Sequence, residues 1–213
     1  MKVVVLGAGG GVGRRAVLVA AAAGHEVVAV ARTAPVVTFG VQSVAGDVRD
    51  PAAVDAVLEG AGAVLWCVGV TRRSGGDVGR AGMPHLVRAM QQRGVGRLVS
   101  VSGAGVTLPG DVKGAGARFV SALTRTFARD LVQDKQGEHD VLVASGLSWT
   151  EVRPPRLSEA AGTGTWTLTD QAPGLRAASV SKADVAAAMV SLAGSQEWVH
   201  RSPFLLAGNG HGS

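Results

Sequence analysis

Short apolar runs alternate with longer helix-forming stretches along most of this chain. The first run, "VVVL" at residues 3–6, is apolar at every position, which is typical of a central parallel strand covered by helices on both faces. Small apolar and helix-forming residues from 12 to 23 predict a helix that Gly24 ends. "EVVAVAR" at 26–32 then predicts a second strand, so the chain opens with a strand, a helix and a strand.

The same alternation continues through the first half of the chain. Further strands are expected around 41–47, at 63–69 and at 97–103, and helices at 51–59 and about 79–93. Strands and helices that alternate in this way are joined by right-handed crossovers and build a parallel sheet. We therefore predict an α/β fold, a doubly wound (Rossmann) parallel sheet with helices on both faces, in a single domain over residues 1–207.

The second half of the chain is harder to assign. Residues 103–135 begin with loop chemistry and continue into one or two amphipathic helices that end near residue 146. "SWTEVRPPR" predicts a sixth strand, which Pro154 and Pro155 stop because proline cannot continue a central ladder. Residues 163–180 are expected to form a small hairpin or a loop insert.

Signals near the C-terminus are clearer. Ser181, with Asp184 three residues later, forms a capping box that predicts the start of a helix. "PFLLAG" supplies a last strand, and residues 208–213 are expected to be a flexible tail. We expect the stretches at 103–130 and 158–180 to be small insertions on the substrate side of the sheet.

Composition narrows the classes of partner. The 213 residues are 46% hydrophobic and 17% charged, with a mean hydropathy of +0.25, which is typical of a globular domain with a large core. The net charge is +5, yet the basic residues are scattered singly or in pairs, without the clustered stripe that nucleic-acid binding uses. We expect no nucleic acid partner, and the excess of arginine favours a small anionic ligand.

Metal, disulfide and membrane functions are not expected either. The single Cys67 excludes an internal disulfide and agrees with a reducing, cytoplasmic setting, and the five histidines lie on separate segments. Arg14 and Arg15 precede an apolar stretch that mimics an export signal, but Gly24, His25 and Glu26 interrupt it. No apolar run approaches the ~20 residues of a membrane span. The expectation is a cytoplasmic monomer or homodimer without metal.

A glycine-rich loop lies where the first strand meets the first helix. The spacing Gly7-x-x-Gly10-x-x-Gly13 at such a join is the dinucleotide fingerprint, in which glycines permit a tight turn, a close approach of the diphosphate and close helix packing. The start of the helix offers free N–H groups to the phosphates. A plain turn in a chain with 31 glycines is the alternative, but the position favours a cofactor. The predicted cofactor-binding residues of this loop are Gly7, Gly10, Gly11, Val12, Gly13 and Arg14.

The end of the second strand indicates which cofactor is bound. Folds specific for NAD tend to place an acid there, whereas this chain has Arg32 followed by Thr33. A guanidinium can make a two-pronged contact with a 2′-phosphate, and Arg14 could reach the same group. The alternative is that both arginines are solvated surface residues. We predict NADP(H) as the cofactor.

Several motifs resemble those of one known group. They are "LGAGGGVGR", "AGDVRDPAAV", "VSVSGAGV", "DKQGEHDVLVASGLSWTEVRPPRL", "GTG" and "VSKADVAAAMV". From residue 1 to about 207 the chain resembles the atypical short-chain dehydrogenase/reductase family with NAD(P)H-binding, NmrA-like domains, which includes flavin reductase/biliverdin-IXβ reductase. The resemblance implies that Asp47 and Val48 lie beside the adenine and that Val68 and Gly69 line the path of the cofactor. It also implies that Ser102 lies near the nicotinamide and that Pro154 and Pro155 form the wall of the nicotinamide pocket. Asp47 has an alternative role as a helix cap before Pro51.

The chain departs from the pattern of mainstream short-chain dehydrogenases. It contains no tyrosine, so the proton donor of a Tyr-x-x-x-Lys site is absent, although Lys135 could occupy the lysine position. Ser102 is followed by Gly103, so the second hydroxyl of a serine pair that is frequent in the family is missing. The resemblance aligns His139 with a histidine of the flavin-reductase relatives. Ser102, Lys135 and His139 are the catalytic candidates.

Two of these side chains also have a structural explanation that involves no catalysis. His139 is also explained as a surface histidine on an amphipathic helix, and Lys135 and Glu138 as ordinary solvated helix residues. Arg72 and Arg73 could face an acidic substrate or the cofactor phosphates, or could be surface residues.

These features predict an NADPH-dependent oxidoreductase with a small-molecule substrate. Hydride transfer needs mainly orientation from the protein, because the cofactor carries the chemistry. A flavin, a quinone or a natural-product intermediate, as a flat conjugated acceptor, can take its proton from water, so the missing tyrosine weakens this function less than carbonyl reduction. The alternatives are a non-catalytic NADP(H)-sensing regulatory protein and an NADP-dependent epimerase or isomerase.

Overall fold

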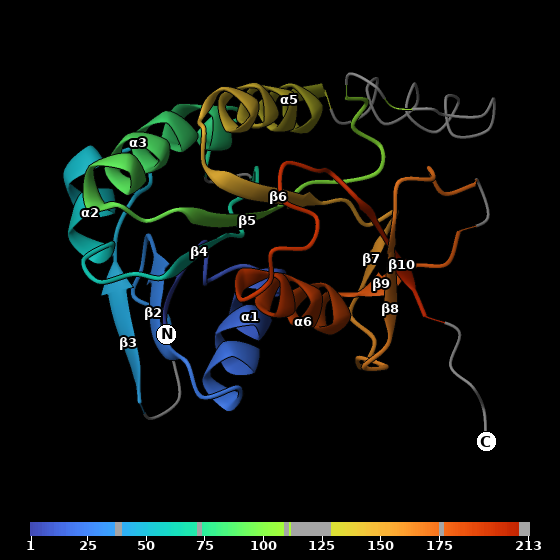
Figure 1. The fold of residues 1–213 in the computed structure, drawn as a ribbon, viewed down its shortest axis with the longest axis horizontal. Helices are drawn as coiled ribbons and strands as arrows, with labels where there is room; N and C mark the ends of the chain where they lie inside the picture. The colour runs from blue at the N-terminus through green and yellow to red at the C-terminus, as the bar shows by residue number, and fades with distance from the viewer. Residues whose placement is uncertain (37–39, 72–73, 109–110, 112–128, 175–176, 209–213) are drawn as a thin grey trace.

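A parallel sheet of six strands runs through the centre of the computed structural model, in the order β3-β2-β1-β4-β5-β6 (Figure 1). The structure describes residues 1–36, 40–71, 74–108, 111, 129–174 and 177–208. The strands are β1 (Lys2–Leu6), β2 (Glu26–Ala31), β3 (Val41–Ala45), β4 (Ala63–Trp66), β5 (Arg97–Val101) and β6 (Ser148–Val152). The strand order reverses between β1 and β4, which confirms the predicted doubly wound α/β fold.

Helices cover both faces of this sheet. The helices α1 (Gly11–Ala22) and α6 (Lys182–Ala193) pack on one face, and the other face carries α2 (Pro51–Val57), α3 (Val78–Arg93) and α5 (Arg129–Ala144) (Figure 1). The inner strands are buried on both sides, which explains why β1 and β4 are apolar at nearly every position. None of the helices within the described residues combines the length and hydropathy needed to cross a membrane.

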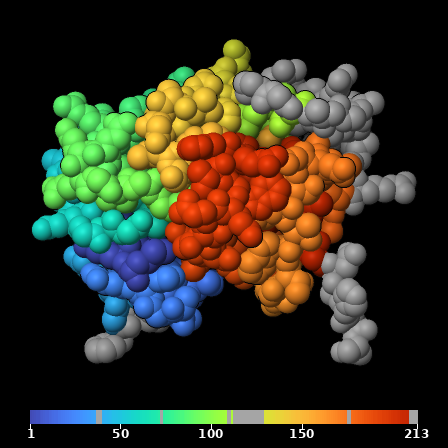
Figure 2. Space-filling model, viewed as in Figure 1, coloured from blue at the N-terminus to red at the C-terminus, as the bar shows by residue number. Residues whose placement is uncertain are grey.

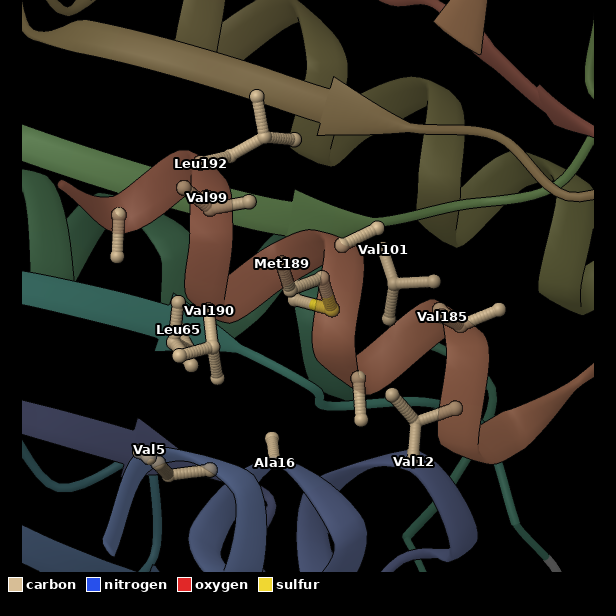
Figure 3. Close-up of a cluster of buried hydrophobic side chains, with 14 of the residues drawn as sticks. Val5, Val12, Ala16, Leu65, Val99, Val101, Val185, Met189, Val190 and Leu192 are labelled. Carbon is tan, nitrogen blue, oxygen red and sulfur yellow. The ribbon is translucent and has the colours of Figure 1, made fainter. Parts of the chain in front are cut away.

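The core on the α1 side shows how small residues set the helix positions. Val12 and Ala16 of α1 face Val185 and Met189 of α6, and the sheet residue Val5 belongs to the same buried cluster (Figure 3). Ala16 is fully buried, and its small side chain lets the two helices approach closely at this level. The packing brings the N-terminal turns of α1 and α6 side by side.

Capping explains where two of the helices begin. Asp50 caps α2, because its side chain accepts a hydrogen bond from the N–H of Ala52. The alternative role of Asp47 as this cap is therefore wrong; its Oδ1 accepts instead from the N–H of Arg49, at 3.0 Å. Ser181 caps α6 as predicted, accepting from the N–H of Asp184 at 2.9 Å.

Some predicted elements are shorter in the structure. The strand expected at 63–69 ends at Trp66, the strand at 97–103 ends at Val101, and the helix at 51–59 ends at Val57. The residues that follow β4 and β5 leave the ladder and form loops at the carboxyl edge of the sheet. Apolar content therefore overestimated the length of both strands.

Two small sheets lie beyond the carboxyl end of β6 (Figure 1). They pair β7 (Leu157–Ser158) with β9 (Val180–Ser181) and β8 (Trp166–Thr169) with β10 (Phe204–Ala207). The small hairpin expected within 163–180 is therefore wrong, because β8 pairs antiparallel with the last strand of the chain. Gly208, the first residue of the expected tail, still donates to the carbonyl of Thr165 at 3.1 Å, and 209–213 lie outside the described residues.

Candidate cofactor and substrate site

The glycine loop follows β1 and lies beside the end of β4, where the strand order reverses. Gly7 has a φ of +83°, and a Cβ added to it would lie 2.6 Å from the carbonyl carbon of Cys67. A Cβ on Gly13 would lie 2.2 Å from the carbonyl oxygen of Gly7. These two positions therefore require glycine, the first for its left-handed backbone and the second for the close approach of α1 to the loop.

The start of α1 suits an anion. Its N-cap is Gly10, which has no side chain to cap the helix, and the first turn carries no acidic residue. Val12 and Gly13 are buried against the core, so this turn is held rigidly with its backbone N–H groups at the crevice. Arg14 is exposed on the same turn. The free N–H groups and the absence of an acid in this turn suit the negative charge of a diphosphate.

The residues predicted to recognise the adenosine end lie on neighbouring strand ends. Arg32 and Thr33 follow β2 directly and are exposed, and Asp47 follows β3. β2 and β3 pair in parallel up to Ala31 and Ala45, so both loops leave the sheet at the same edge. The structure thus brings together the residues assigned to the 2′-phosphate and to the adenine.

Val48, Val68 and Gly69 complete this edge. Val48 and Val68 are almost entirely buried in the core on the α3 side, and Gly69 is half-buried. A Cβ on Gly82 of α3 would lie 2.7 Å from Cγ2 of Val48, so the side chain of Val48 is packed against that helix. Arg72 and Arg73, the cations expected after this strand, lie outside the described residues.

A cavity of about 500 Å³ opens beside the ends of β5 and β6. Its lining is mainly apolar and includes four of the predicted site residues, Ser102, Lys135, Pro154 and Pro155. The loops that carry them are joined, because the N–H of Ala104 donates to the carbonyl of Pro154 at 2.9 Å. The Oγ of Ser102 is buried and has no hydrogen-bond partner among the described residues. This hydroxyl can therefore bond to a ligand.

Lys135 lines this cavity together with a second cation, Arg156, and Lys135 is buried rather than solvated. Its Nζ donates to the carbonyl of Val68 at 2.7 Å and to both carboxylate oxygens of Glu138 at 3.0 and 2.9 Å. The alternative that Lys135 and Glu138 are solvated helix residues is wrong, because α5 packs this face against α3. Burial raises the pKa of Glu138 to about 7, and the nearby Lys135 opposes that rise.

Glu138 can approach α3 only because Gly79 has no side chain. A Cβ on Gly79 would lie 1.7 Å from Oε1 of Glu138. Asp134, fully buried one turn earlier on α5, accepts from the N–H groups of Gly79 and Arg80 at 2.9 Å each. It thus caps the start of α3 from another helix. The sequence gives no local signal for this cap, since the partners are 54 and 55 residues apart.

His139 lies apart from the other catalytic candidates. Its Nδ1 is 2.9 Å from Oε2 of Glu151, which also accepts from the hydroxyl of Ser202 at 2.9 Å. The side chain lines a second cavity with Trp149 and Arg153, and it does not line the cavity that holds Ser102 and Lys135. His139 is buried, so the alternative of a surface histidine is wrong.

Comparison with known proteins identifies the family. A family model described as NAD(P)H-binding matches residues 7–196, which include the glycine loop and the cavity-lining Pro154 and Pro155. The chain belongs to this NAD(P)H-binding family. The resemblance drawn from the motifs is confirmed at that level, and so is a nicotinamide dinucleotide as the family's cofactor. The NAD(P)H-binding assignment agrees with a loop made of glycines and Ala8 and with a first helical turn free of acids.

Solved structures show the same fold. ChuY, an anaerobillin reductase from Escherichia coli O157:H7, is 26% identical with a TM-score of 0.80 and 98% coverage of each chain. The oxidoreductase ylbE from Lactococcus lactis is 23% identical, with a TM-score of 0.81 over 98% of this chain and 92% of its own. A short-chain dehydrogenase/reductase from Veillonella parvula, solved in complex with NADP, is 18% identical with a TM-score of 0.77 over 99% and 95%. The last two likenesses show the fold alone.

A curated relative matches part of this NAD(P)H-binding chain. An uncharacterised protein of Mycobacterium tuberculosis (strain ATCC 25618 / H37Rv) is 34% identical over 103 residues. The match covers 48% of this chain and 12% of that protein.

Proposed function

We propose that this protein is an NADPH-dependent oxidoreductase that reduces a flat conjugated acceptor, such as a flavin, a quinone or a natural-product intermediate. The observation that carries the proposal is the mainly apolar cavity beside the ends of β5 and β6, with Ser102 and Lys135 in its wall. Ligands of open α/β sheets bind beyond the carboxyl ends of the strands, and this cavity lies at that edge of the sheet, as the glycine loop does.

The cofactor would lie across the reversal point of the sheet. Its diphosphate would rest on the N–H groups of Gly11, Val12 and Gly13, and its adenosine end would lie beside Arg32, Thr33 and Asp47. NADPH supplies the hydride when it is bound. Arg32, with Arg14, would pair with the 2′-phosphate, and this pairing is the basis for preferring NADPH to NADH.

Ser102 and Lys135 are the two side chains of the cavity that we assign to binding the acceptor. The unpartnered Oγ of Ser102 can donate to, or accept from, a polar atom of the ligand. Lys135 is fixed by Val68 and Glu138, so it presents a positive charge in a place that water reaches poorly. A cation there would stabilise negative charge that develops on the acceptor as hydride arrives. Its ammonium could also donate the accompanying proton and regain one through Glu138.

His139 has a weaker claim to catalysis. Its imidazole is bonded to Glu151 and faces the second cavity, so we assign it no part in hydride transfer. Pro154 and Pro155 are proposed to wall the nicotinamide end, since both line the cavity. The likeness to ChuY, an anaerobillin reductase, supports reduction as the reaction type.

The test is direct. The purified chain is mixed with NADPH and a panel of flavins and quinones, and the loss of nicotinamide absorbance is followed against NADH and against a Lys135→Met variant. We expect turnover with at least one acceptor, faster with NADPH than with NADH. No absorbance loss with any acceptor would contradict the proposal.

The absence of tyrosine from the sequence leaves a second candidate function, an NADP(H)-sensing regulatory protein. Tight binding of NADP(H) without turnover would favour it. Nicotinamide that co-purifies and never exchanges would instead favour an epimerase or isomerase.

A further inference from the structure

Three charged side chains from distant parts of the chain meet beside the glycine loop. Nη2 of Arg15, on α1, is 3.0 Å from Oε2 of Glu159. Nζ of Lys182, the first residue of α6, makes an ion pair with Oε1 of the same carboxylate. Arg15 also donates through Nη1 to the carbonyl of Gly11 at 2.8 Å. One carboxylate is thus held by two cations at the N-terminal turn of α1.

Lys182 lies directly over Gly11. A Cβ added to Gly11 would be 2.8 Å from both Cδ and Nζ of Lys182. The contact follows from the packing of the two helices, whose first turns carry the neighbouring Val12 and Val185 (Figure 3). An ammonium group from the last helix therefore stands at the loop where the diphosphate is expected.

Glu159 is brought to this place by the small sheet that precedes it. Ser158 pairs with Ser181 between β7 and β9, so the next residue on one strand lies beside the next on the other. Asp184 fixes the following loop, because its carboxylate accepts from the N–H groups of Thr163 and Gly164 at 3.1 and 2.9 Å. Figure 2 shows the orange residues that follow β6 lying against the red α6.

The two partners of this ion pair differ in exposure. The side chain of Glu159 is 68% exposed, whereas that of Lys182 is 23% exposed. Lys182 is therefore held by the protein, and the carboxylate is on the solvent side, from which a ligand arrives. The bond from Lys182 lowers the pKa of Glu159, which keeps it an anion at neutral pH.

We propose that Lys182 is a ligand of the cofactor diphosphate, and that Glu159 is an internal anion that occupies Lys182 and Arg15 until the cofactor displaces it. A helix N-terminus favours negative charge, and two cations beside it strengthen that preference. The carboxylate satisfies this arrangement in the free protein. On binding, a phosphate group replaces it and Glu159 turns into solvent. This inference rests on the cofactor of the proposed function and not on its acceptor.

Binding of NADP⁺ to the full chain tests the proposal by calorimetric titration of wild type, Lys182→Met and Glu159→Gln. We expect the Kd of Lys182→Met to rise about tenfold, because a charge-assisted contact to phosphate is lost. We expect the Kd of Glu159→Gln to fall about threefold or more, because the competing anion is removed. The dependence of log Kd on log salt should be shallower for Lys182→Met, since one charge contact is missing.

Controls separate the proposal from general effects. Asp55→Asn removes the acid from the exposed ion pair between Asp55 and Arg93, on the other face of the sheet, and should leave Kd unchanged. Adenosine 2′-monophosphate has no diphosphate, so its Kd should be the same for wild type and Lys182→Met. If Lys182→Met does not fold, the Kd values of Lys182→Gln and Glu159→Gln for NADP⁺ test the proposal instead.

An unchanged Kd in Lys182→Met, or a higher Kd in Glu159→Gln, would overturn the proposal. Failure of the proposed function looks different. In that case NADP⁺ still binds, with these shifts in Kd, but no acceptor is reduced.

Discussion

Nζ of Lys135 lies 2.7 Å from the carbonyl oxygen of Val68, and this hydrogen bond ties the middle of α5 to the loop after β4. The same ammonium contacts both oxygens of Glu138 and lines the cavity beside Ser102. A single side chain therefore joins the expected path of the cofactor, a buried carboxylate and the expected place of the acceptor.

Lys135→Met is expected to lower kcat with the best acceptor by about 10- to 100-fold. The substitution removes the cation from the cavity and keeps the length of the side chain, so the Kd of NADPH should change by less than about threefold. Steady-state kinetics and a separate binding titration measure the two effects. A Lys135→Arg variant, which retains the charge, should recover part of kcat, whereas equal losses in both variants would assign Lys135 a purely structural role.

The buried carboxyl of Glu138 makes stability depend on pH. Its ordinary pKa is 4.5, and burial raises it to about 7 in the folded chain. Between these values the native state binds more protons than the unfolded state, so this group's contribution to the free energy of unfolding falls as the pH rises. Glu138→Gln cannot ionise and should gain stability relative to wild type from pH 4.5 to 7, by about 1 to 3 kcal/mol, with no further gain above.

Urea unfolding of both proteins at pH 5, 6, 7 and 8 measures this difference. A difference that does not vary with pH would mean that Glu138 titrates at its ordinary pKa.

Cofactor choice is expected to depend on Arg32. Arg32→Ser should raise the Kd of NADPH about tenfold or more and change that of NADH by less than about twofold, because only NADPH carries the 2′-phosphate. Arg88→Ser, an exposed arginine on α3, is the matched control and should alter neither value. Equal losses for both cofactors would show that Arg32 contributes to folding or to general binding rather than to discrimination.

The contact between α3 and α5 should tolerate no side chain at residue 79. Gly79→Ala would place a Cβ 1.7 Å from Oε1 of Glu138, and we expect it to lower the free energy of unfolding by about 2 kcal/mol. Gly96→Ala is the control, since nothing lies within 4 Å of its added Cβ, and it should change stability by no more than about 0.5 kcal/mol. Denaturant titration compares the two. Equal losses of stability in the two variants would show that the contact between α3 and α5 can rearrange to accept a side chain.

The central sheet and the cofactor loop could be predicted from sequence because their signals are local. Apolar runs such as "VVVL" indicate strands that are buried on both faces. Gly7, Gly10 and Gly13 lie within seven consecutive residues, between the end of the first strand and the first turn of the helix. The position of Arg32 followed from the same reasoning, since it comes at the end of the second strand, whereas Asp47 was implied by the family resemblance. Neighbouring parallel strands then bring them to one edge.

Burial of polar side chains could not be predicted in this way. Lys135, Glu138 and His139 lie on a helix whose mixed polarity predicts exposure to solvent. Their burial depends on partners elsewhere: Val68 for Lys135, Gly79 for Glu138 and Glu151 for His139. Those partners lie on other elements, and no local pattern links them to α5. The pairing of β8 with β10 is nonlocal for the same reason, which is why residues 163–180 suggested a hairpin of their own.

The late pairing of β10 with β8 also bears on how the chain matures during synthesis. All six strands of the central sheet are complete once residue 152 has left the ribosome, whereas β8 must wait for residues 204–207 before it has a partner. Domains assemble from the N-terminal side as they emerge. The central sheet can therefore assemble first, and β8 gains its partner strand only after residues 204–207 have emerged.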